Sequence, residues 1–548
     1  MLYETILTRA DRERYRAANL WPDRLLNDDL AVAVARSPDK TAITDARGSY
    51  TYTALHDAVD RCALGLLDLG VRRGDVVTVQ MPNWNEFVIA LLAIERIGAV
   101  INPIAPIFRQ RELRSMLRLA QPVVAIVPAA FRGFVYPTMW EELRHDAPSL
   151  RTLVVVDGQE SDGTTLSWHD LLARGAAQER YRPALDWLRP SPDDVSELIF
   201  TSGTTGEPKG VLHTANTLGS NVQAVIAGLG LTADDVIHMA STFAHQTGFL
   251  YGMRMVIQLG ARGVYQDLWD ATRFVELVDR EGITFSMGAT PFLSDILRAP
   301  NRAAHNLRSF RYFVCAGAPI PQPLADAVAR ELPCRLVPGW GMTENGLVTA
   351  VLPDDPAEKI VTSDGHPYPG MEVIVRDDER RPVPPGVEGE LWARGAFTFA
   401  GYVQGRRFTE QFFDADGWFD TGDRARMDAA GYIRITGRTK DLIIRGGENI
   451  PVKEIEDVII GHPKVRNVAL VAVPDPRLGE TACACIIPEP GETLTLEELR
   501  DYLAKQQVTR QFWPEHLLLL EEFPTTPSGK VQKFHLREMV RDRVGASR

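Results

Sequence analysis

The stretch ELIFTSGTTGEPKGV, residues 197–211, joins an apolar run to a loop that is rich in glycine, threonine and serine. The glycines are Gly203, Gly206 and Gly210, and the hydroxyl donors are Thr201, Ser202, Thr204 and Thr205. Glycine lets the backbone bring bare N–H groups close to an anion, and Lys209 adds a positive charge. Lys209 follows Pro208 rather than glycine, so the pattern of the ordinary P-loop is not met. A turn between strands would also use glycine and threonine, but this loop has more donors than a hairpin needs and predicts a phosphate site.

On both sides of this loop, from about residue 50 to 435, helical stretches alternate with short β-rich runs. We expect helices at 61–71, 86–99 and 267–282, and strands at 75–81, 123–128, 152–156 and 283–289. Continuously apolar strands that alternate with helices are typical of parallel sheets covered by helices. Because one compact α/β unit rarely exceeds about 250–300 residues, this part of the chain predicts two stacked α/β subdomains.

The pattern changes near residue 365. Short strands and turns at 371–377, 386–395, 417–423 and 431–437 predict a small, mostly antiparallel β-subdomain. After GRTKD, residues 437–441, we expect helices at 452–461 and 496–505 and strands near 466–474, 481–488 and 516–521. This order predicts a separate α+β module at the C-terminal end.

Composition excludes several classes of partner. The chain has 548 residues, of which 45% are hydrophobic and 24% charged, and its formal net charge is −12. An acidic chain with scattered basic residues argues against nucleic acid as the main partner and against charge-driven binding to an anionic membrane. The charged N-terminus predicts no signal peptide. The most apolar stretch, residues 87–108, contains Glu95 and Arg96 and falls short of a membrane span.

The five cysteines show no zinc-binding spacing; they are Cys62, Cys315, Cys334, Cys483 and Cys485. Cys483 and Cys485 lie in an apolar run with the alternation of a strand. We expect buried free thiols, which fit a reducing cytoplasm.

A second polar site is PGWGMTENG, residues 338–346, in which Glu344 follows Thr343. A carboxylate beside a phosphate loop is repulsive unless a divalent cation lies between them, so magnesium held by Glu344 and phosphate oxygens would fit. The other interpretation is that Thr343 and Glu344 form the N-cap of a helix.

Two further segments carry charges in predicted turns. Asp423 ends GWFDTGD, residues 417–423, and Arg438 lies in the turn that follows the next strand. A carboxylate is well suited to vicinal ribose hydroxyls, although each residue could be an ordinary surface group. Prolines and a glycine in PTTPSGKVQKFHLRE, residues 524–538, present Lys530 at the tip of an extended segment, where a lysine is usually only solvated.

In this order and at these distances, the segments LIFTSGTTGEPKG, GWGMTE, GELWARG, GWFDTGD, GRTKDLI and PTTPSGK resemble the superfamily of acyl- and aryl-CoA synthetases, luciferases and peptide-synthetase adenylation domains. The resemblance covers nearly the whole chain. It implies ATP, Mg²⁺ and coenzyme A as cofactors. In the implied reaction a carboxylate attacks the α-phosphate of ATP, pyrophosphate leaves, and a thiol then displaces AMP from the acyl-adenylate.

The resemblance also implies residue roles. Lys530 would bridge the carboxylate and the α-phosphate, helped by Thr205, Thr343 and a magnesium ion held by Thr205 and Glu344. Besides the phosphate loop with Lys209, the nucleotide would contact Gly317, Ala318, Pro319, Gly339, Trp340, Gly341, Met342, Asp423, Ile435 and Arg438.

The resemblance further implies two domains, 1–439 and 440–548, with a mobile C-terminal domain that pivots at Lys440 between the two half-reactions. One face of that domain would present Lys530. The other would present IIRGGENI, in which Gly446 and Gly447, followed by Glu448, let the pantetheine arm of coenzyme A pass close to the backbone.

The acyl pocket should be formed by residues 243–249, 287–292, 315–319 and 346–348, which are mostly apolar or small. His245 falls where the family places a gate beside the substrate, although a packed core histidine is the alternative. No aspartate lies in 243–249, which disfavours α-amino acids, and Gln246 stands where hydroxybenzoate-loading relatives tend to have asparagine. The chain looks most like cyclohexanecarboxylate-CoA ligases and medium-chain acyl-CoA synthetases, so we expect a small-to-medium apolar acid, aliphatic or alicyclic.

Three alternatives stay open: an aryl-acid adenylating enzyme that loads a carrier-protein phosphopantetheine, a non-catalytic nucleotide-binding regulator, and an oxygenase of luciferase type. The presence of both Lys530 and Glu344 disfavours the regulator. The chain departs from the family's Tyr/Phe-Lys-x-Pro element at RQFWPE, residues 510–515, which puts local coenzyme A contacts in doubt. A homodimer is compatible with the resemblance.

Overall fold

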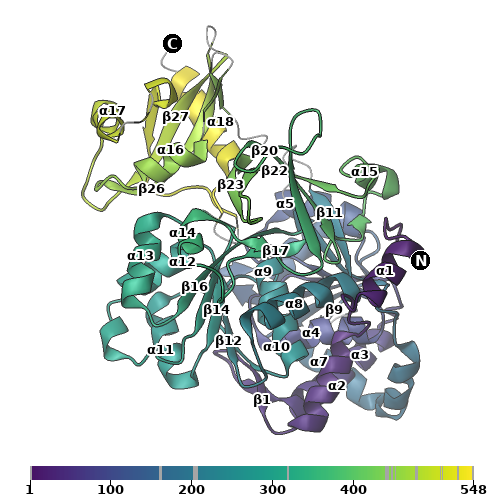
Figure 1. The fold of residues 1–548 in the computed structure, drawn as a ribbon. Coiled ribbons are helices and arrows are strands. Elements are labelled where there is room, and N and C mark those ends of the chain that lie inside the picture. Colours follow the sequence, from purple (N-terminus) through teal and green to yellow (C-terminus); the bar gives the residue numbers. More distant parts are fainter. Residues whose placement is uncertain are drawn as a thin grey trace.

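The structure, a computed structural model, is a mixed α/β protein with a large N-terminal domain and a smaller C-terminal domain at one end of it (Figure 1). It describes residues 3–158, 163–201, 208–317, 320–438, 443–445, 448–450, 452–475, 479–506, 508, 510–526 and 530–545. No helix within these ranges is long and apolar enough to cross a membrane.

The first large sheet has eight strands in the order β21-β11-β10-β4-β3-β5-β8-β9. The strands are β3 (Val76–Val79), β4 (Val100–Pro103), β5 (Val124–Pro128), β8 (Thr152–Val156), β9 (Thr165–Ser167), β10 (Val195–Thr201), β11 (Lys209–Thr214) and β21 (Gly401–Tyr402). Neighbours from β10 to β9 run parallel, whereas β11 is antiparallel to both β10 and β21. A short hairpin, β6 (Ala130–Phe131) and β7 (Phe134–Val135), lies outside this sheet.

The second large sheet has nine strands in the order β18-β17-β16-β15-β14-β12-β13-β1-β2. They are β1 (Thr41–Thr44), β2 (Ser49–Thr51), β12 (Val236–Met239), β13 (Arg262–Tyr265), β14 (Phe285–Gly288), β15 (Tyr312–Cys315), β16 (Arg335–Met342), β17 (Gly346–Ala350) and β18 (His366–Pro367). The chain therefore starts this sheet with β1 and β2, builds the whole core of the other sheet, and returns to pair β13 with β1 in parallel.

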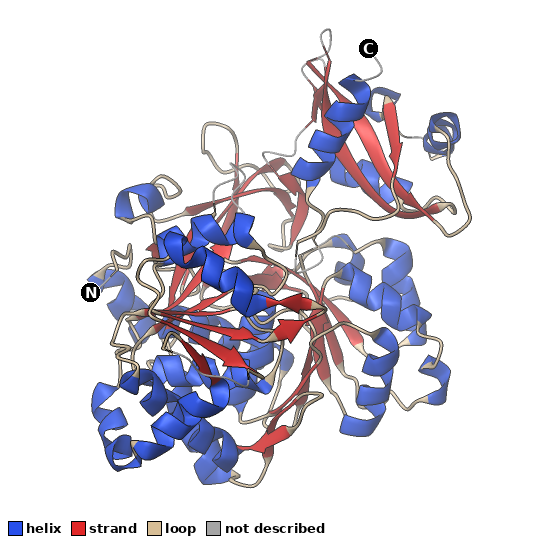
Figure 2. Ribbon diagram, turned by 180° about the vertical axis from the view of Figure 1, so that it is seen from behind, coloured by secondary structure: helices blue, strands red, loops and turns tan. Residues whose placement is uncertain are grey.

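Helices pack against both large sheets, some on the outside and some between the two sheets (Figure 2). The longer ones are α2 (Leu26–Arg36), α3 (Tyr52–Asp68), α4 (Asn85–Arg96), α5 (Gln110–Ala120), α7 (Trp168–Ala177), α8 (Ala215–Leu229), α11 (Ala271–Glu281), α12 (Thr290–Arg298) and α13 (Gln322–Glu331). Shorter ones are α6 (Tyr136–Glu142), α10 (Met255–Leu259), α14 (Lys359–Thr362), α15 (Arg406–Glu410) and the 3₁₀ turns Leu143–Asp146, Glu179–Leu188 and Arg302–Ala304. Helix α4 is buried almost all round in a core that both sheets share, which explains its uniformly apolar sequence.

The small β-subdomain is a four-stranded antiparallel sheet in the order β19-β20-β22-β23. Its strands are β19 (Met371–Arg376), β20 (Glu388–Gly395), β22 (Phe419–Met427) and β23 (Ile433–Arg438). They match the four β-rich segments predicted from the sequence.

The C-terminal domain has β24 (Ile443–Arg445), β25 (Glu448–Ile450), β26 (Val465–Asp475), β27 (Gly479–Pro488) and β28 (His516–Leu519), with helices α16 (Val452–Ile459), α17 (Leu496–Lys505) and α18 (Lys533–Gly545) and a 3₁₀ turn at Arg510–Phe512. An ion pair joins it to the large domain, with Arg298 Nη2 lying 3.3 Å from Glu489 Oε1. For the C-terminal domain, the sequence analysis located every described strand except β24 and β25. It missed α18, because it treated the first residues of that helix as part of the extended segment that carries Lys530.

Two helices, α3 and α11, begin at other residues than the sequence predicts, because a cap residue determines where each one starts. Thr51 accepts a hydrogen bond from the N–H of Ala54, so α3 begins at Tyr52 rather than at residue 61. Asp270 accepts from the N–H of Arg273, so α11 begins at Ala271 rather than at 267. The five cysteines are free and buried, as predicted, and Cys483 and Cys485 face the same apolar cluster.

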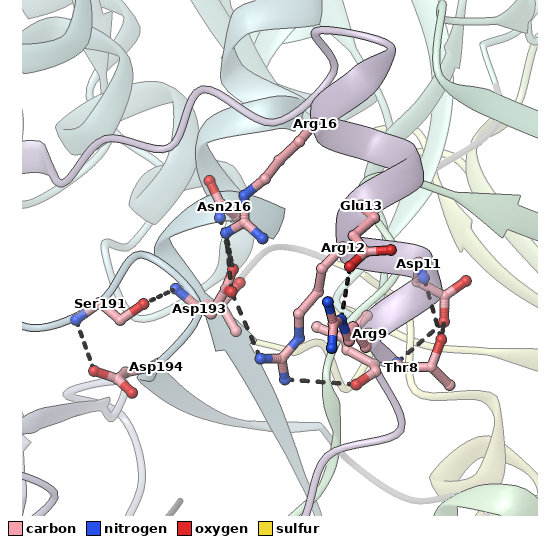
Figure 3. Close-up of polar contacts among 12 residues, drawn as sticks. Thr8, Arg9, Asp11, Arg12, Glu13, Arg16, Ser191, Asp193, Asp194 and Asn216 are labelled. Carbon is pink, nitrogen blue, oxygen red and sulfur yellow. Dashed lines mark hydrogen bonds and ion pairs between the residues drawn. The ribbon is translucent and has the colours of Figure 1, made fainter.

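The N-terminal helix α1 (Arg9–Ala17) is tied to the base of the β10–β11 hairpin (Figure 3). Arg16 Nη2 donates to both carboxylate oxygens of Asp193 at 2.9 Å, and Arg12 Nη1 lies 3.5 Å from the same group. Asn216, in the first turn of α8, donates to Asp193 at 2.9 Å and to Asp23 at 3.0 Å. Charge-assisted contacts thus fix both the entry into β10 and the exit from β11.

Candidate functional site

The predicted phosphate loop connects two antiparallel strands. Thr201, at the end of β10, is the register partner of Lys209, at the start of β11. Ser202, Gly203, Thr204, Thr205 and Gly206 lie outside the described residues. A Cβ atom at Gly210 would come within 2.5 Å of Val403 Cγ1, so close strand packing requires glycine there. The loop is therefore a hairpin connection, which is compatible with phosphate binding.

Lys209 points at a cluster of aromatic rings. Its Nζ lies 3.8 Å from the ring centroid of Phe412 and 5.2 Å from that of Tyr402. A cation over a ring face is attracted by the ring quadrupole. These rings hold the ammonium group at the base of the loop.

Glu344 lies in a hairpin turn, which excludes the helix N-cap interpretation. Gly339, Trp340, Gly341 and Met342 form the end of β16, and residues 343–345 turn into β17. A side chain at Gly341 would collide with the backbone of Gly346 and Leu347, so the close approach of the two strands requires glycine.

Glu344 is 6% exposed and held from two sides. The phenol of Tyr402 donates to Glu344 Oε1 at 2.8 Å, and the N–H of Phe399 donates to the Glu344 carbonyl at 2.8 Å. Burial, followed by the neighbouring Glu344, raises the pKa of Tyr402 far above its ordinary value, so this phenol remains a donor. The described residues contain no group of three or more His, Cys, Asp or Glu side chains suited to a metal. One carboxylate completed by substrate phosphates and water is the ligand set that Mg²⁺ uses, and Glu344 fits it.

Asp423 and Arg438 do not lie in turns, so that prediction was wrong. They are register partners in the neighbouring strands β22 and β23. Gly422, with φ of +68°, belongs to a bulge in β22, where the register against β20 shifts. Gly-Asp in a bulge has the same local sequence as a turn, which explains the error. Asp423 is 5% exposed and accepts from Trp340 Nε1 at 2.8 Å.

The Trp340–Asp423 bond predicts the effect of Trp340→Phe. Losing a hydrogen bond to a buried carboxylate costs about 1.5–3 kcal/mol. Because Asp423 is the predicted ribose ligand, we expect the KM for ATP to rise by about tenfold or more, with a smaller change in the KM for the acid. Initial rates at varied ATP measure this. An unchanged KM for ATP would show that Asp423 does not contribute to binding of the nucleotide.

His213, which the sequence analysis missed, holds the Thr343–Glu344 turn through a hydrogen bond to the Thr343 carbonyl. It is 1% exposed on β11, its Nε2 lies 2.8 Å from the Thr343 carbonyl, and its Nδ1 lies 3.1 Å from Thr217 Oγ1. Burial lowers the pKa of His213 to about 4, so at neutral pH the ring is uncharged. Since a carbonyl only accepts, the ring hydrogen is on Nε2 and is donated to Thr343.

We expect His213→Leu to lower the rate of adenylation about tenfold, since a buried carbonyl that loses its donor costs about 1–3 kcal/mol. His213→Gln, which keeps an N–H donor, should recover part of the rate. The measurement is kcat for pyrophosphate release, alongside the melting temperature. A fall in melting temperature with an unaltered kcat would assign His213 to stability alone.

His245 lies at the start of the short helix α9 (Gln246–Gly248), which continues into a π-helical turn, η3 (Phe249–Arg254). Its Nδ1 accepts from the N–H of Thr247 at 3.2 Å. Burial and then the charge of Lys530 lower the pKa of His245 to about 4. The N–H of Lys530 donates to Thr526 Oγ1 at 3.1 Å.

Other predicted residues fall at strand ends or outside the described ranges. Gly317 follows β15 with φ of +83°, a conformation that favours glycine, and the N–H of Ile435 in β23 donates to Asp364 Oδ2 at 2.8 Å. Glu448 is the first residue of β25. Ala318, Pro319, Lys440, Gly446 and Gly447 lie outside the described residues.

Comparisons with known proteins identify the family of the chain. Residues 30–403 match the family model "AMP-binding enzyme", and residues 454–530 match "AMP-binding enzyme C-terminal domain". The chain is 36% identical to a medium-chain fatty-acid–CoA ligase of Escherichia coli (strain K12), over 97% of this chain and 93% of that protein. It is 33% identical to a salicylyl-CoA synthase / salicylate adenylyltransferase of Streptomyces sp, over 97% and 96%.

Among solved structures, an anthranilate CoA ligase, AuaEII, in complex with anthranoyl-AMP superposes with a TM-score of 0.85 at 25% identity, covering 96% of this chain and 98% of that one. Family models that match both parts of the chain, together with relatives above 30% identity across nearly its full length, settle its membership. The chain belongs to the AMP-binding enzyme family and is an AMP-forming acid–CoA ligase that uses ATP and coenzyme A.

Proposed function

We propose that this ligase activates a small-to-medium apolar acid, aliphatic or alicyclic, and transfers it to coenzyme A. Two sets of contacts support the nucleotide site: Tyr402 bonds Glu344 and lies beside Lys209, and Trp340 bonds Asp423. These contacts join residues from three sheets. The apolar character of segments 243–249 and 287–292 and the name of the Escherichia coli relative support the choice of acid.

In the proposed first half-reaction, the substrate carboxylate attacks the α-phosphate of ATP and pyrophosphate leaves. Two anions meet, so fixed cations and donors must stabilise the charge that develops on phosphate oxygens. Lys530 bridges the two reacting groups, and Thr343 and the phosphate loop with Lys209 supply donors. Asp423 and Arg438 hold the ribose. Magnesium bound by Glu344 and Thr205 would neutralise phosphate charge.

In the proposed second half-reaction, the thiol of coenzyme A displaces AMP. The domains 1–439 and 440–548 would rotate about Lys440, exchanging Lys530 for the segment around Gly446, Gly447 and Glu448. Supporting this, the ion pairs Arg298–Glu489 and Arg434–Asp457, which cross the boundary between the described parts of the two domains, are partly exposed to solvent, and exposed pairs are typically worth only about 0–1 kcal/mol. The proposal also includes a cytoplasmic location, which the free buried cysteines support, and it allows a homodimer.

A second candidate is an aryl acid, loaded on coenzyme A or on a carrier protein. The observations in its favour are the Streptomyces relative named as a salicylyl-CoA synthase / salicylate adenylyltransferase and the similar structure that holds anthranoyl-AMP. His245 and Gln246, adjacent at the start of α9, would face such a ring.

The test is pyrophosphate release with ATP and magnesium across a panel of acids, with and without coenzyme A. The panel runs from short to medium straight chains through cyclohexanecarboxylate, benzoate, salicylate and amino acids. We expect the highest kcat/KM with a medium-chain or alicyclic acid and an acyl-CoA product. Turnover with aryl acids alone, and no coenzyme A thioester, would overturn this choice in favour of carrier loading.

A further inference from the structure

A buried carboxyl group contacts the start of α9, where His245 and Gln246 form what we call the acyl-binding corner. Glu197, in the middle of β10, is 0% exposed, and Gln246, the first residue of α9, is 4% exposed. Gln246 Nε2 donates to Glu197 Oε2 at 2.8 Å. Within the described part of the chain, the other carboxyl oxygen of Glu197 and the amide oxygen of Gln246 have no partner. This pair is the link between the strand that leads into the phosphate loop and the helix that begins beside His245.

The elements packed against Glu197 supply little counter-charge. Its register partner on β11 is His213, which is neutral, and its partner on β4 is the apolar Ile101. The nearby cation is Arg254 of η3, whose Nη1 lies 3.3 Å from Glu95 and is thus already paired. A carboxylate in such surroundings would be poorly compensated.

Burial raises the pKa of Glu197 to about 8, against the smaller lowering effects of the Gln246 hydrogen bond and the charge of Arg254. At neutral pH the group is therefore mainly a neutral carboxylic acid. The neutral acid brings one hydrogen to a pair that otherwise has two oxygens without a donor. Ionisation would remove that hydrogen and place a buried negative charge behind the acyl-binding corner.

We propose that Glu197, through its hydrogen bond with Gln246, is a positioning residue that fixes the His245–Gln246 corner for the carboxylic acid substrate. This inference rests on the proposed function, in which that corner lines the acyl pocket. Two consequences follow. Removing the carboxyl group should raise the KM for the acid more than it lowers kcat. Ionising it should weaken binding of the acid, because the substrate is itself an anion and the site is buried.

The experiment compares wild type, Glu197→Gln and Glu197→Ala by ATP–pyrophosphate exchange between pH 6 and 9.5, with the best acid from the panel. We expect Glu197→Ala to raise the KM for the acid about tenfold at pH 7, whereas Glu197→Gln, a permanently neutral isostere, stays within about threefold of wild type. Above about pH 8 the wild type should lose kcat/KM for the acid, while Glu197→Gln keeps a flatter profile.

Two controls separate positioning from general disruption. Ser196→Ala removes a neighbouring hydroxyl of the same strand that has no hydrogen-bond partner among the described residues, so it should leave the KM for the acid unchanged. Effects of Glu197→Ala and Gln246→Ala should be non-additive in a double-mutant cycle if the two side chains act as one unit. Identical alkaline profiles for wild type and Glu197→Gln, or additive effects of the two alanine variants, would overturn the proposal.

An infrared difference spectrum between wild type and Glu197→Gln at pH 7 tests the neutral state without turnover. A protonated carboxyl C=O band assigned to Glu197 supports the proposal, and a carboxylate band refutes it. This readout stays informative if no acid in the panel is adenylated. Failure of every acid in the panel to be adenylated would defeat the proposed function. A carboxylate band with normal turnover would defeat only the inference about Glu197.

Discussion

Lys530→Ala should lose adenylation by about 10²–10³-fold, while thioester formation from preformed acyl-adenylate largely survives. Removing one preorganised donor from a transition state in which charge develops typically costs this much. The N–H of Lys530 donates to Thr526 Oγ1, and the charge of Lys530 lowers the pKa of His245; both support the proposed role of Lys530 in the first half-reaction. Pyrophosphate release measures the first step, and coenzyme A-dependent AMP release from supplied adenylate measures the second.

Lys464→Ala is the matched control, because Lys464 is a lysine of the same domain that pairs with Glu498 at 2.8 Å on the surface. It should leave both half-reactions within about twofold of wild type, since surface ion pairs contribute little. Equal loss of both half-reactions in Lys530→Ala would refute a role confined to adenylation.

Glu344→Gln should lower adenylation by about 10²-fold and raise the magnesium concentration needed for half-maximal rate. The amide keeps the shape of the side chain and an oxygen for the Tyr402 hydroxyl, so the turn between β16 and β17 should remain intact. What disappears is the negative charge that a hard cation prefers in its ligands. Rates measured over a magnesium series at fixed ATP give both quantities.

Tyr402→Phe provides the comparison, because it removes the hydrogen bond and leaves the charge. Loss of a donor to a buried carboxylate costs about 1.5–3 kcal/mol, so a moderate rate loss with an ordinary magnesium requirement is expected. If Glu344→Gln shows the same magnesium dependence as wild type, the assignment of Glu344 as a metal ligand is wrong.

Local sequence patterns predicted the architecture well, because continuous apolar strands, capped helices and glycine-rich loops are determined mainly by neighbouring residues. They located the strands near 75–81, 123–128, 152–156 and 283–289 and the small β-subdomain. They failed where the deciding contact is distant along the chain. Nothing near His213 indicates that it donates to Thr343, and nothing near Glu197 indicates Gln246, because both contacts require the sheets to be assembled.

The same reason explains the error at Asp423. Its TGD sequence matches a turn, and only pairing with β20 and β23 makes it a bulge within a continuous strand. Trp340, predicted only as a nucleotide contact, is also the hydrogen-bond donor that holds this carboxylate. Sequence therefore named the candidate residues, and the structure adds how Asp423 and Trp340 are held.

The return of the chain to β1 has a consequence for synthesis on the ribosome. Ile43 of β1 pairs with Gly263 of β13, so the first strand of the nine-stranded sheet has no parallel partner until β13 emerges. At about 5–20 residues per second, translation of the intervening segment takes roughly 10–45 s. During this interval the β1–β2 hairpin exposes an unpaired edge, the kind of surface that promotes aggregation. We therefore expect the nascent β1–β2 hairpin to benefit from a chaperone during synthesis.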